Sequence, residues 1–249
     1  MIKLRITETT NDEVYIYTGN GRTPKDVKNV IIQDGVKNIR DSAFDNCKNL
    51  TSITIPDSVT SIGHWAFCGC TSLTSLTIPD SVTSIGTCAF AHCPNLKSLT
   101  IPDGVTSIGT GTFMDSDGLT HVTIPDSVTN IGVRAFDGCD SLKRITLHPG
   151  ITKISESAFN HCVSLKSITI PGSVTKIEQG AFNDCTSLTS VTISNGVTSI
   201  GDYAFCGCSS LKSITIPDSV TNIGDNVVQY CRDLDDTTIE KIQFIQNKK

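Results

Sequence analysis

The sequence predicts a repeat solenoid built mainly from β-structure, and three observations support this fold class. A unit of 23 residues returns nine times in phase over residues 27–234 without an insertion. One position of the unit holds an Ala-Phe pair, and the position three residues after the Phe holds Cys. Each unit also carries a short alternation of apolar and polar residues, which is typical of a strand. A fixed period of this length indicates stacked coils that share one core.

The Ala-Phe position anchors the repeat. It is filled by Ala43-Phe44, Ala66-Phe67, Ala89-Phe90, Ala135-Phe136, Ala158-Phe159, Ala181-Phe182 and Ala204-Phe205. Thr112-Phe113 and Val227-Val228 fill it in the other two units. Because each Phe returns at the same place in its coil, we expect these rings to pack on one another along the axis.

Each coil is predicted to have two extended sides and one bend. Residues 53–55, Ile-Thr-Ile, form the first strand, and the Pro-Asp-Ser at 56–58 ends it. Residues 59–62 form a second extended segment, which ends at Gly63, and residues 66–70 predict a short helical or 3₁₀ corner. The strands of nine successive coils would pair as parallel sheets, with coils about 4.8 Å apart.

The cysteine content indicates buried free thiols. Eight of the 11 cysteines share one column of the repeat: Cys47, Cys70, Cys93, Cys139, Cys162, Cys185, Cys208 and Cys231. Ser116 fills the ninth place, and only Cys68, Cys88 and Cys206 lie outside the column. Because these cysteines recur at one position of the repeat, we interpret them as small, weakly polar side chains packed in the core rather than as a disulfide framework.

The ends depart from the repeat as caps would. Residues 1–26 predict an N-terminal hairpin cap, because residues 2–6 and 14–16 alternate on either side of the turn-forming residues 9–12. Residues 27–234 form the solenoid. Residues 235–249 predict a C-terminal helical cap, in which residues 236–238 precede Ile239, Ile242 and Ile245 at helical spacing.

Composition excludes several function classes. Charged residues make up 18% of the chain and the net charge is −5, which argues against a nucleic-acid binder with a broad basic surface. The beginning of the chain has no apolar stretch suited to a signal peptide or a membrane span, so we expect no membrane insertion. The chain as given favours a cytoplasmic location.

Written out, the unit L-x-x-I-x-I-P-D-S-V-T-S-I-G-x-x-A-F-x-x-C resembles the leucine-rich repeats of the BspA-like, or treponemal, type. The resemblance implies a right-handed leucine-rich solenoid. Known members are often surface proteins of bacteria and of microbial eukaryotes that adhere to host or matrix proteins, which implies a cell-surface or secreted location. The family carries no catalytic residues and no fixed ligand positions, so the resemblance implies neither an enzyme nor a cofactor.

The outward columns of the first strand are the expected binding surface, because this strand lines a concave face in leucine-rich solenoids. One column is Thr in eight coils, among them Thr123, Thr146 and Thr169. Cations replace the hydroxyl residues in three successive coils, at His121, Lys143, Arg144 and Lys166. These residues are the candidate partner-binding site.

Such a basic patch could receive an acidic protein segment, a sulfated glycan or a phosphate group, with Arg144 able to bind a carboxylate or phosphate through two hydrogen bonds. The plainer interpretation is solvated charge that keeps the sheet from aggregating. The sequence thus predicts a non-catalytic module that binds a protein partner through the concave sheet.

Other patterns give weaker predictions. The Thr column and a second one, from Thr60 to Thr221, resemble ice-binding arrays, although Thr also favours strands. An Asp follows the first strand in five consecutive coils, where it suits a turn better than a calcium site. The pairs Cys68/Cys70 and Cys206/Cys208 have the wrong spacing for a zinc or redox motif.

Overall fold

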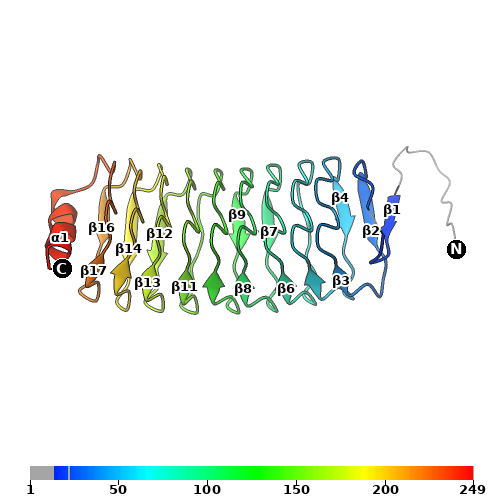
Figure 1. The fold of residues 1–249 in the computed structure, drawn as a ribbon, viewed down its shortest axis with the longest axis horizontal. Helices are drawn as coiled ribbons and strands as arrows, with labels where there is room; N and C mark the ends of the chain where they lie inside the picture. Colours follow the sequence, from blue (N-terminus) through cyan, green and yellow to red (C-terminus); the bar gives the residue numbers. More distant parts are fainter. Residues whose placement is uncertain (1–13, 22, 249) are drawn as a thin grey trace.

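The structure, a computed structural model, describes residues 14–21 and 23–248. The chain winds into a row of coils that runs nearly straight from strand β1 to helix α1 (Figure 1). Each coil advances by 23 residues, since Thr169 lies opposite Thr192 in a parallel strand pair. The predicted solenoid with parallel sheets is therefore confirmed.

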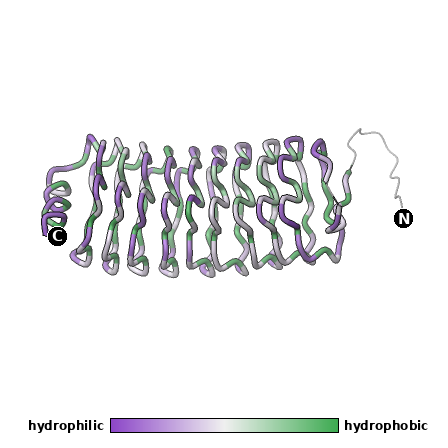
Figure 2. Tube along the Cα trace, viewed as in Figure 1, coloured by the Kyte–Doolittle hydropathy of each residue, from purple (hydrophilic) through white to green (hydrophobic). Residues whose placement is uncertain are grey.

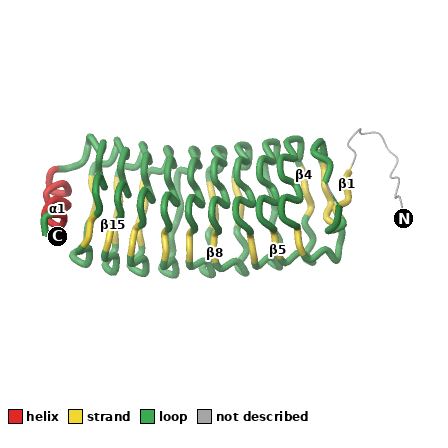
Figure 3. The backbone as a smooth tube through the Cα atoms, in the orientation of Figure 1, coloured by secondary structure: helices red, strands yellow, loops and turns green. Residues whose placement is uncertain are grey.

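The first strands of the coils form one set of parallel sheets (Figures 1 and 3). They are β1 (Val14–Tyr17), β2 (Asn29–Ile32), β4 (Ser52–Thr54), β7 (Ser98–Thr100), β9 (His121–Thr123), β12 (Ser167–Ile170), β14 (Ser190–Ile193) and β16 (Ser213–Thr215). Exposed and buried residues alternate along β14, so each strand turns its Ser and Thr outward and its apolar residues into the core. We call the outward side of this set the first-strand face.

Short second strands form the other set of parallel sheets. They are β3 (Asn38–Ile39), β5 (Ser61–Ile62), β6 (Ser84–Ile85), β8 (Ser107–Ile108), β10 (Asn130–Ile131), β11 (Lys153–Ile154), β13 (Lys176–Ile177), β15 (Ser199–Ile200) and β17 (Asn222–Ile223). Six of them, from β8 to β17, join in one sheet. The Ile of each strand is buried or partly buried against the core.

The corner after the second strand is a run of turns, and the expected short helix does not form there. Two positions of every corner hold residues with positive φ, such as Ser157 at 54° and His161 at 55°. A right-handed helix needs negative φ throughout, so these two left-handed residues exclude it. Alternate amides bond within the corner and to the next coil: the amide of Ala158 donates to Ser155, and that of Phe159 donates to Ala181.

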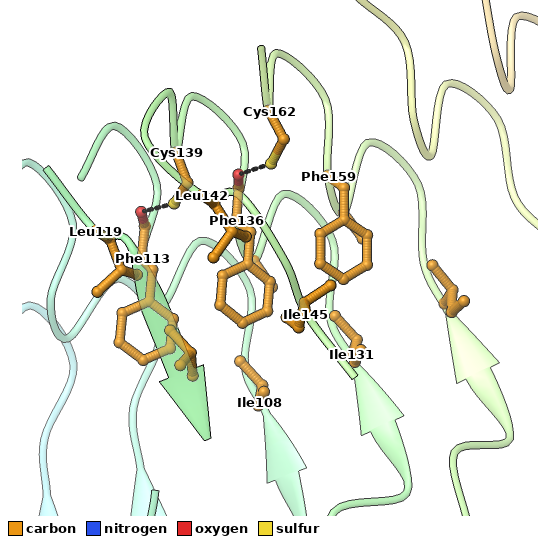
Figure 4. Packing of buried hydrophobic residues seen from close by; sticks show 14 of the residues in the cluster. Ile108, Phe113, Leu119, Ile131, Phe136, Cys139, Leu142, Ile145, Phe159 and Cys162 are labelled. Carbon is orange, nitrogen blue, oxygen red and sulfur yellow. Dashed lines mark hydrogen bonds between the residues drawn. The ribbon is translucent and has the colours of Figure 1, made fainter. Parts of the chain in front are cut away.

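The core is a stack of phenylalanine rings (Figure 4). The ring centroids of Phe136 and Phe159 lie 5.2 Å apart, with their planes only 2° from parallel. All eight phenylalanines of the Ala-Phe position are fully buried. Hydrophobic and hydrophilic residues alternate around the coils (Figure 2), and the apolar columns are buried inside the turns. Stacking of like rings couples every coil to its neighbours.

The cysteine column has a hydrogen-bonding role beside its packing role. The thiol of Cys162 donates to the carbonyl oxygen of Phe136 in the preceding coil, at 3.2 Å (Figure 4). The hydroxyl of Ser116 donates to Phe90 in the same way, at 2.8 Å. A small side chain with one donor therefore satisfies a buried carbonyl. Seven of the eight cysteines in the column are buried and Cys231 is partly buried, which agrees with the packing role expected of the column.

The N-terminal end begins with β1, which pairs in parallel with β2. Tyr17 is fully buried and its ring packs on Phe44, with centroids 5.1 Å apart. Its hydroxyl accepts a hydrogen bond from the amide of Arg40, at 3.2 Å, so Tyr17 closes the first coil. The predicted hairpin places its other strand at residues 2–6, which lie outside the described residues.

The C-terminal end is covered by α1 (Asp236–Gln246), which packs against β16 and β17. The N-cap is Asp235, one residue before the segment that the sequence suggested, and its carboxylate accepts from the amide of Thr238 at 2.8 Å. Hydrogen bonds from the Thr238 hydroxyl and amide lower the pKa of Asp235. Ile242 and Ile245 are buried, so the helix closes the last coil.

Candidate functional site

The first-strand face presents exposed hydroxyl groups over most of its length. Thr123, Thr146 and Thr169 are all exposed and stand in successive coils. Between them the inward residues, such as Val122 and Ile168, are buried. The face is therefore a polar surface on a rigid support, which positions any side chain that replaces a hydroxyl residue.

The predicted cations share this face. His121 belongs to β9, Lys143 and Arg144 belong to the next coil, and Lys166 directly precedes β12. All four are exposed, and the amide of Lys166 donates to the carbonyl of Lys143 at 3.3 Å. Their places in three successive coils agree with the sequence-based expectation. Within the described residues, Lys143, Arg144 and Lys166 form no ion pair.

The strand ladder is interrupted at this site. Residues 144–147 keep the exposed-buried alternation of a strand but pair with neither β9 nor β12. Among the described residues, the amides of residues 143–147 donate no backbone hydrogen bond. We call this segment the charged break. In an intact parallel sheet these groups would bond to the neighbouring strands, so their polar atoms need water or a ligand instead.

A second interruption lies 69 residues, or three coils, earlier. Residues 75–78 join no sheet, and the amides of residues 74–78 donate no backbone hydrogen bond to any described residue. Thr74 and Ser75 stand where the charged break has Lys143 and Arg144. We call this segment the neutral break, because it repeats the backbone feature without the charges.

A cavity of about 230 Å³ opens beside the charged break. It is lined by residues 144–147 of one coil and residues 167–169 of the next. Arg144, Thr146 and Thr169, three of the predicted site residues, belong to this lining, whereas His121, Lys143, Lys166 and Thr123 do not. Sequence reasoning found the cations but missed the cavity.

One sequence signal marks the same coil as unusual. His148 stands where the neighbouring coils have Pro125 and Pro171. Its ring is largely buried, with Nδ1 accepting from the amide of Gly150 at 3.0 Å and Nε2 left without a partner among the described residues. The coil with the charged break is therefore also the coil that departs from the Pro-Asp turn.

A larger cavity, of about 870 Å³, lies at the N-terminal end. Its charged lining residues include Lys25, Arg40, Asp41 and Asp45. Arg40 donates to the carbonyl of Gly21 at 2.6 Å, and Lys25 pairs with Asp45 at 3.8 Å. Since these cations already have partners within the chain, the charged break offers the freer charges.

The second Thr column is occupied by structural hydrogen bonds. The hydroxyl of Thr152 donates to the carbonyl of Thr129 at 3.1 Å, and that of Thr198 donates to Thr175 at 3.0 Å. These contacts fasten each coil to the one before it. The hydroxyls of this column are therefore less available to an external ligand than those of the first-strand face.

The cysteines are poorly suited to chemistry. Burial raises the pKa of Cys68 to about 11 and that of Cys93 to about 12, which keeps both thiols protonated at neutral pH. Within residues 14–21 and 23–248, no group of three His, Cys, Asp or Glu side chains is arranged to hold a metal ion. The same part of the chain contains no helix long and apolar enough to cross a bilayer.

Comparison with known protein families agrees with this architecture. Residues 23–143 and 106–235 match the family described as BspA type Leucine rich repeat region, in six copies. No curated protein matches the chain in sequence.

Solved structures give the same result. The chain is similar to a leucine-rich repeat protein from Bacteroides ovatus, with 25% identity and a TM-score of 0.52 over 84% of this chain and 72% of that one. It is similar to the leucine-rich repeat protein of T. pallidum, with 26% identity and a TM-score of 0.50 over 87% and 82% of the two chains. The pneumococcal vaccine antigen PcpA shares the fold, at 19% identity and a TM-score of 0.52 over 88% and 65%.

Proposed function

Because the chain belongs to the BspA-type leucine-rich repeat family, we propose that it is a non-catalytic recognition module that binds a protein partner through its first-strand face. The observation that carries the proposal is the group of exposed cations His121, Lys143, Arg144 and Lys166 in columns that are otherwise mainly Ser and Thr. Thr123, Thr146 and Thr169 flank them and complete the proposed site.

The mechanism is rigid presentation of a polar surface with one charged focus. The phenylalanine stack holds successive coils at a fixed spacing, so the backbone of the face loses little freedom on binding. Hydroxyl groups supply many weak contacts, while the cations attract and orient a partner of opposite charge. Adhesion to a host or matrix glycoprotein would be the cell-surface form of the same function.

The alternative is a structural or ice-binding array that uses the Thr columns. Two observations favour the recognition module. The hydroxyls of the second column, such as that of Thr152, already donate to the backbone. The first column loses its regular backbone support at the two breaks, in residues 75–78 and 144–147. An ordered lattice of water or crystal surface needs an uninterrupted spacing.

The test is a quantitative pull-down from the organism's lysate and culture medium. The wild-type chain is compared with a variant carrying His121→Ser, Lys143→Thr, Arg144→Ser and Lys166→Thr, which restores the residues of the regular coils. We expect a protein that the wild type retains and the variant loses. The captured protein, once purified, should bind the wild-type chain directly.

A matched control removes the same number of formal charges from the opposite side of the coils. It carries Lys153→Ser in β11, Lys176→Ser in β13 and Lys37→Thr, directly before β3. This control should retain the partner. Equal capture by the wild type and the first variant would contradict the proposed site. Inhibition of ice growth that survives loss of the cations would favour the Thr array.

A further inference from the structure

The charged break combines two features that arise from different sources. The cations come from substitutions in the outward columns, whereas the cavity and the unpaired amides come from an interruption of the backbone ladder. The neutral break shows that the interruption occurs without the charges, in residues 75–78. Only residues 143–147 bring a guanidinium, an ammonium and unpaired amides to one place among the breaks.

We propose that the cavity at the charged break binds a carboxylate side chain of an acidic peptide segment, which makes the partner in the proposed function an acidic protein. This inference rests on that proposed function. The carboxylate would accept hydrogen bonds from the guanidinium of Arg144 and from the hydroxyls of Thr146 and Thr169, all of which line the cavity. A planar guanidinium suits a carboxylate because it can donate two parallel hydrogen bonds.

The open backbone adds further donors. In a strand, amide groups lie in the plane of the sheet and point toward the neighbouring strands. The amides of residues 143–147 therefore border the gaps on either side of this coil, where no described backbone carbonyl accepts from them. Amide donors near a cation favour an anionic ligand, because each hydrogen bond to a charged acceptor is stronger than one to a neutral acceptor.

The surroundings favour a single acidic segment over a sulfated glycan. The cavity, at about 230 Å³, has room for a side chain rather than for several sugar rings. Lys97 and Lys212 are also exposed in the column of Lys143 and Lys166, so the size of the cavity, rather than the extent of the charge, favours a single side chain.

The test uses fluorescence anisotropy with a labelled oligo-glutamate peptide, and an oligo-glutamine peptide of equal length as the uncharged probe. Measurements are made at physiological ionic strength, where the screening length is about 8 Å. The wild-type chain should bind oligo-glutamate but not oligo-glutamine. The variant Lys143→Thr with Arg144→Ser should bind roughly tenfold to a hundredfold more weakly, as expected for losing charge-assisted hydrogen bonds.

The two breaks allow a matched transplant. In the Lys143→Thr, Arg144→Ser background, Thr74→Lys with Ser75→Arg places the same charges on the neutral break. In the same background, Thr189→Lys with Ser190→Arg places them on the intact ladder at β14. The first transplant should restore binding and the second should not. Equal binding by both would overturn the proposal, because charge without the open backbone would then suffice.

Three further results would overturn the proposal. One is failure of oligo-glutamate to bind the wild-type chain. Another is displacement of the peptide by a sulfated oligosaccharide at far lower concentration than by unlabelled peptide, which would assign the cavity to sulfate. The third is binding unchanged by Arg144→Ser. If capture in the pull-down still depends on the four cations in any of these cases, the proposed protein-binding function is retained. Only the inference that the partner supplies an acidic segment is then rejected.

Discussion

The thiol of Cys139 donates to the carbonyl oxygen of Phe113, at 3.2 Å, and thereby joins two successive coils through their buried columns. Ser116 makes the equivalent contact to Phe90. We therefore expect Cys139→Ser to keep the fold with little change in stability. Cys139→Ala leaves the carbonyl with one partner fewer and should lower the free energy of unfolding by about 1–2 kcal/mol. Urea unfolding of both variants checks this, and equal stability of the two would contradict it.

The buried thiols also predict a loss of stability at alkaline pH. Burial raises the pKa of Cys93 from 9.0 to about 12 and raises that of Cys139 as well. Between these values the unfolded chain loses a proton that the folded chain keeps, so stability is full below pH 9 and declines above it. The decline should approach about 1.4 kcal/mol per pH unit for each such thiol.

Urea unfolding under reducing conditions, at neutral pH and above pH 9, measures this decline. Cys139→Ser is the control, because a hydroxyl does not ionise in this range, and its stability should fall less steeply than that of the wild type. Parallel curves for the two proteins would show that Cys139 does not contribute.

His148→Pro should stabilise the protein. The substitution removes a buried Nε2 without a described partner and restores the residue that Pro125 and Pro171 provide in the adjacent coils. The amide of His148 donates no backbone hydrogen bond to a described residue, so proline costs none there. The Gly150 amide loses Nδ1 as its acceptor, but the equivalent amides of Ser127 and Ser173 have no acceptor among the described residues either. We expect a gain of about 1 kcal/mol in the free energy of unfolding. The reverse change, Pro171→His, should destabilise, and a loss of stability in His148→Pro would refute the argument.

At position 157, glycine should give a more stable protein than alanine. The φ of Ser157 is 54°, in the left-handed region, and Gly180 occupies the same position one coil later. A left-handed residue with a Cβ costs about 1 kcal/mol, so Ser157→Gly should be more stable than Ser157→Ala by that amount. At Ser190, in the extended strand β14, the order should reverse. Thermal or urea unfolding of the four variants decides between the two orders.

Amide exchange should reveal the two breaks in solution. The amides of residues 144–147 and 75–78 have no described backbone acceptor, whereas those of β14 lie in a ladder between β12 and β16. Hydrogen exchange should therefore be faster in both breaks than in Ser190–Ile193. Mass spectrometry of peptic fragments measures the rates, and equal protection of the three segments would show that the ladder is continuous.

The sequence determined the solenoid, its period and the contents of its core. Apolar residues return every 23 positions, and the Phe and Cys columns identify which side of each coil faces the core. The same periodicity assigned His121, Lys143, Arg144 and Lys166 to one exposed face. Periodicity predicts these features because the tendency of a side chain to be buried depends on its residue type, which can be read from the sequence.

The tertiary structure decided the corners and the breaks. Trp65 and Ser157 share a left-handed corner position with glycines, so residue type alone did not exclude a helix there. Residues 144–147 alternate as residues 190–193 do, yet only the latter pair with both neighbours. Hydrogen bonds between coils depend on the spacing and orientation of two distant backbone segments. That geometry, and with it the cavity beside Arg144, exists only once the coils have stacked.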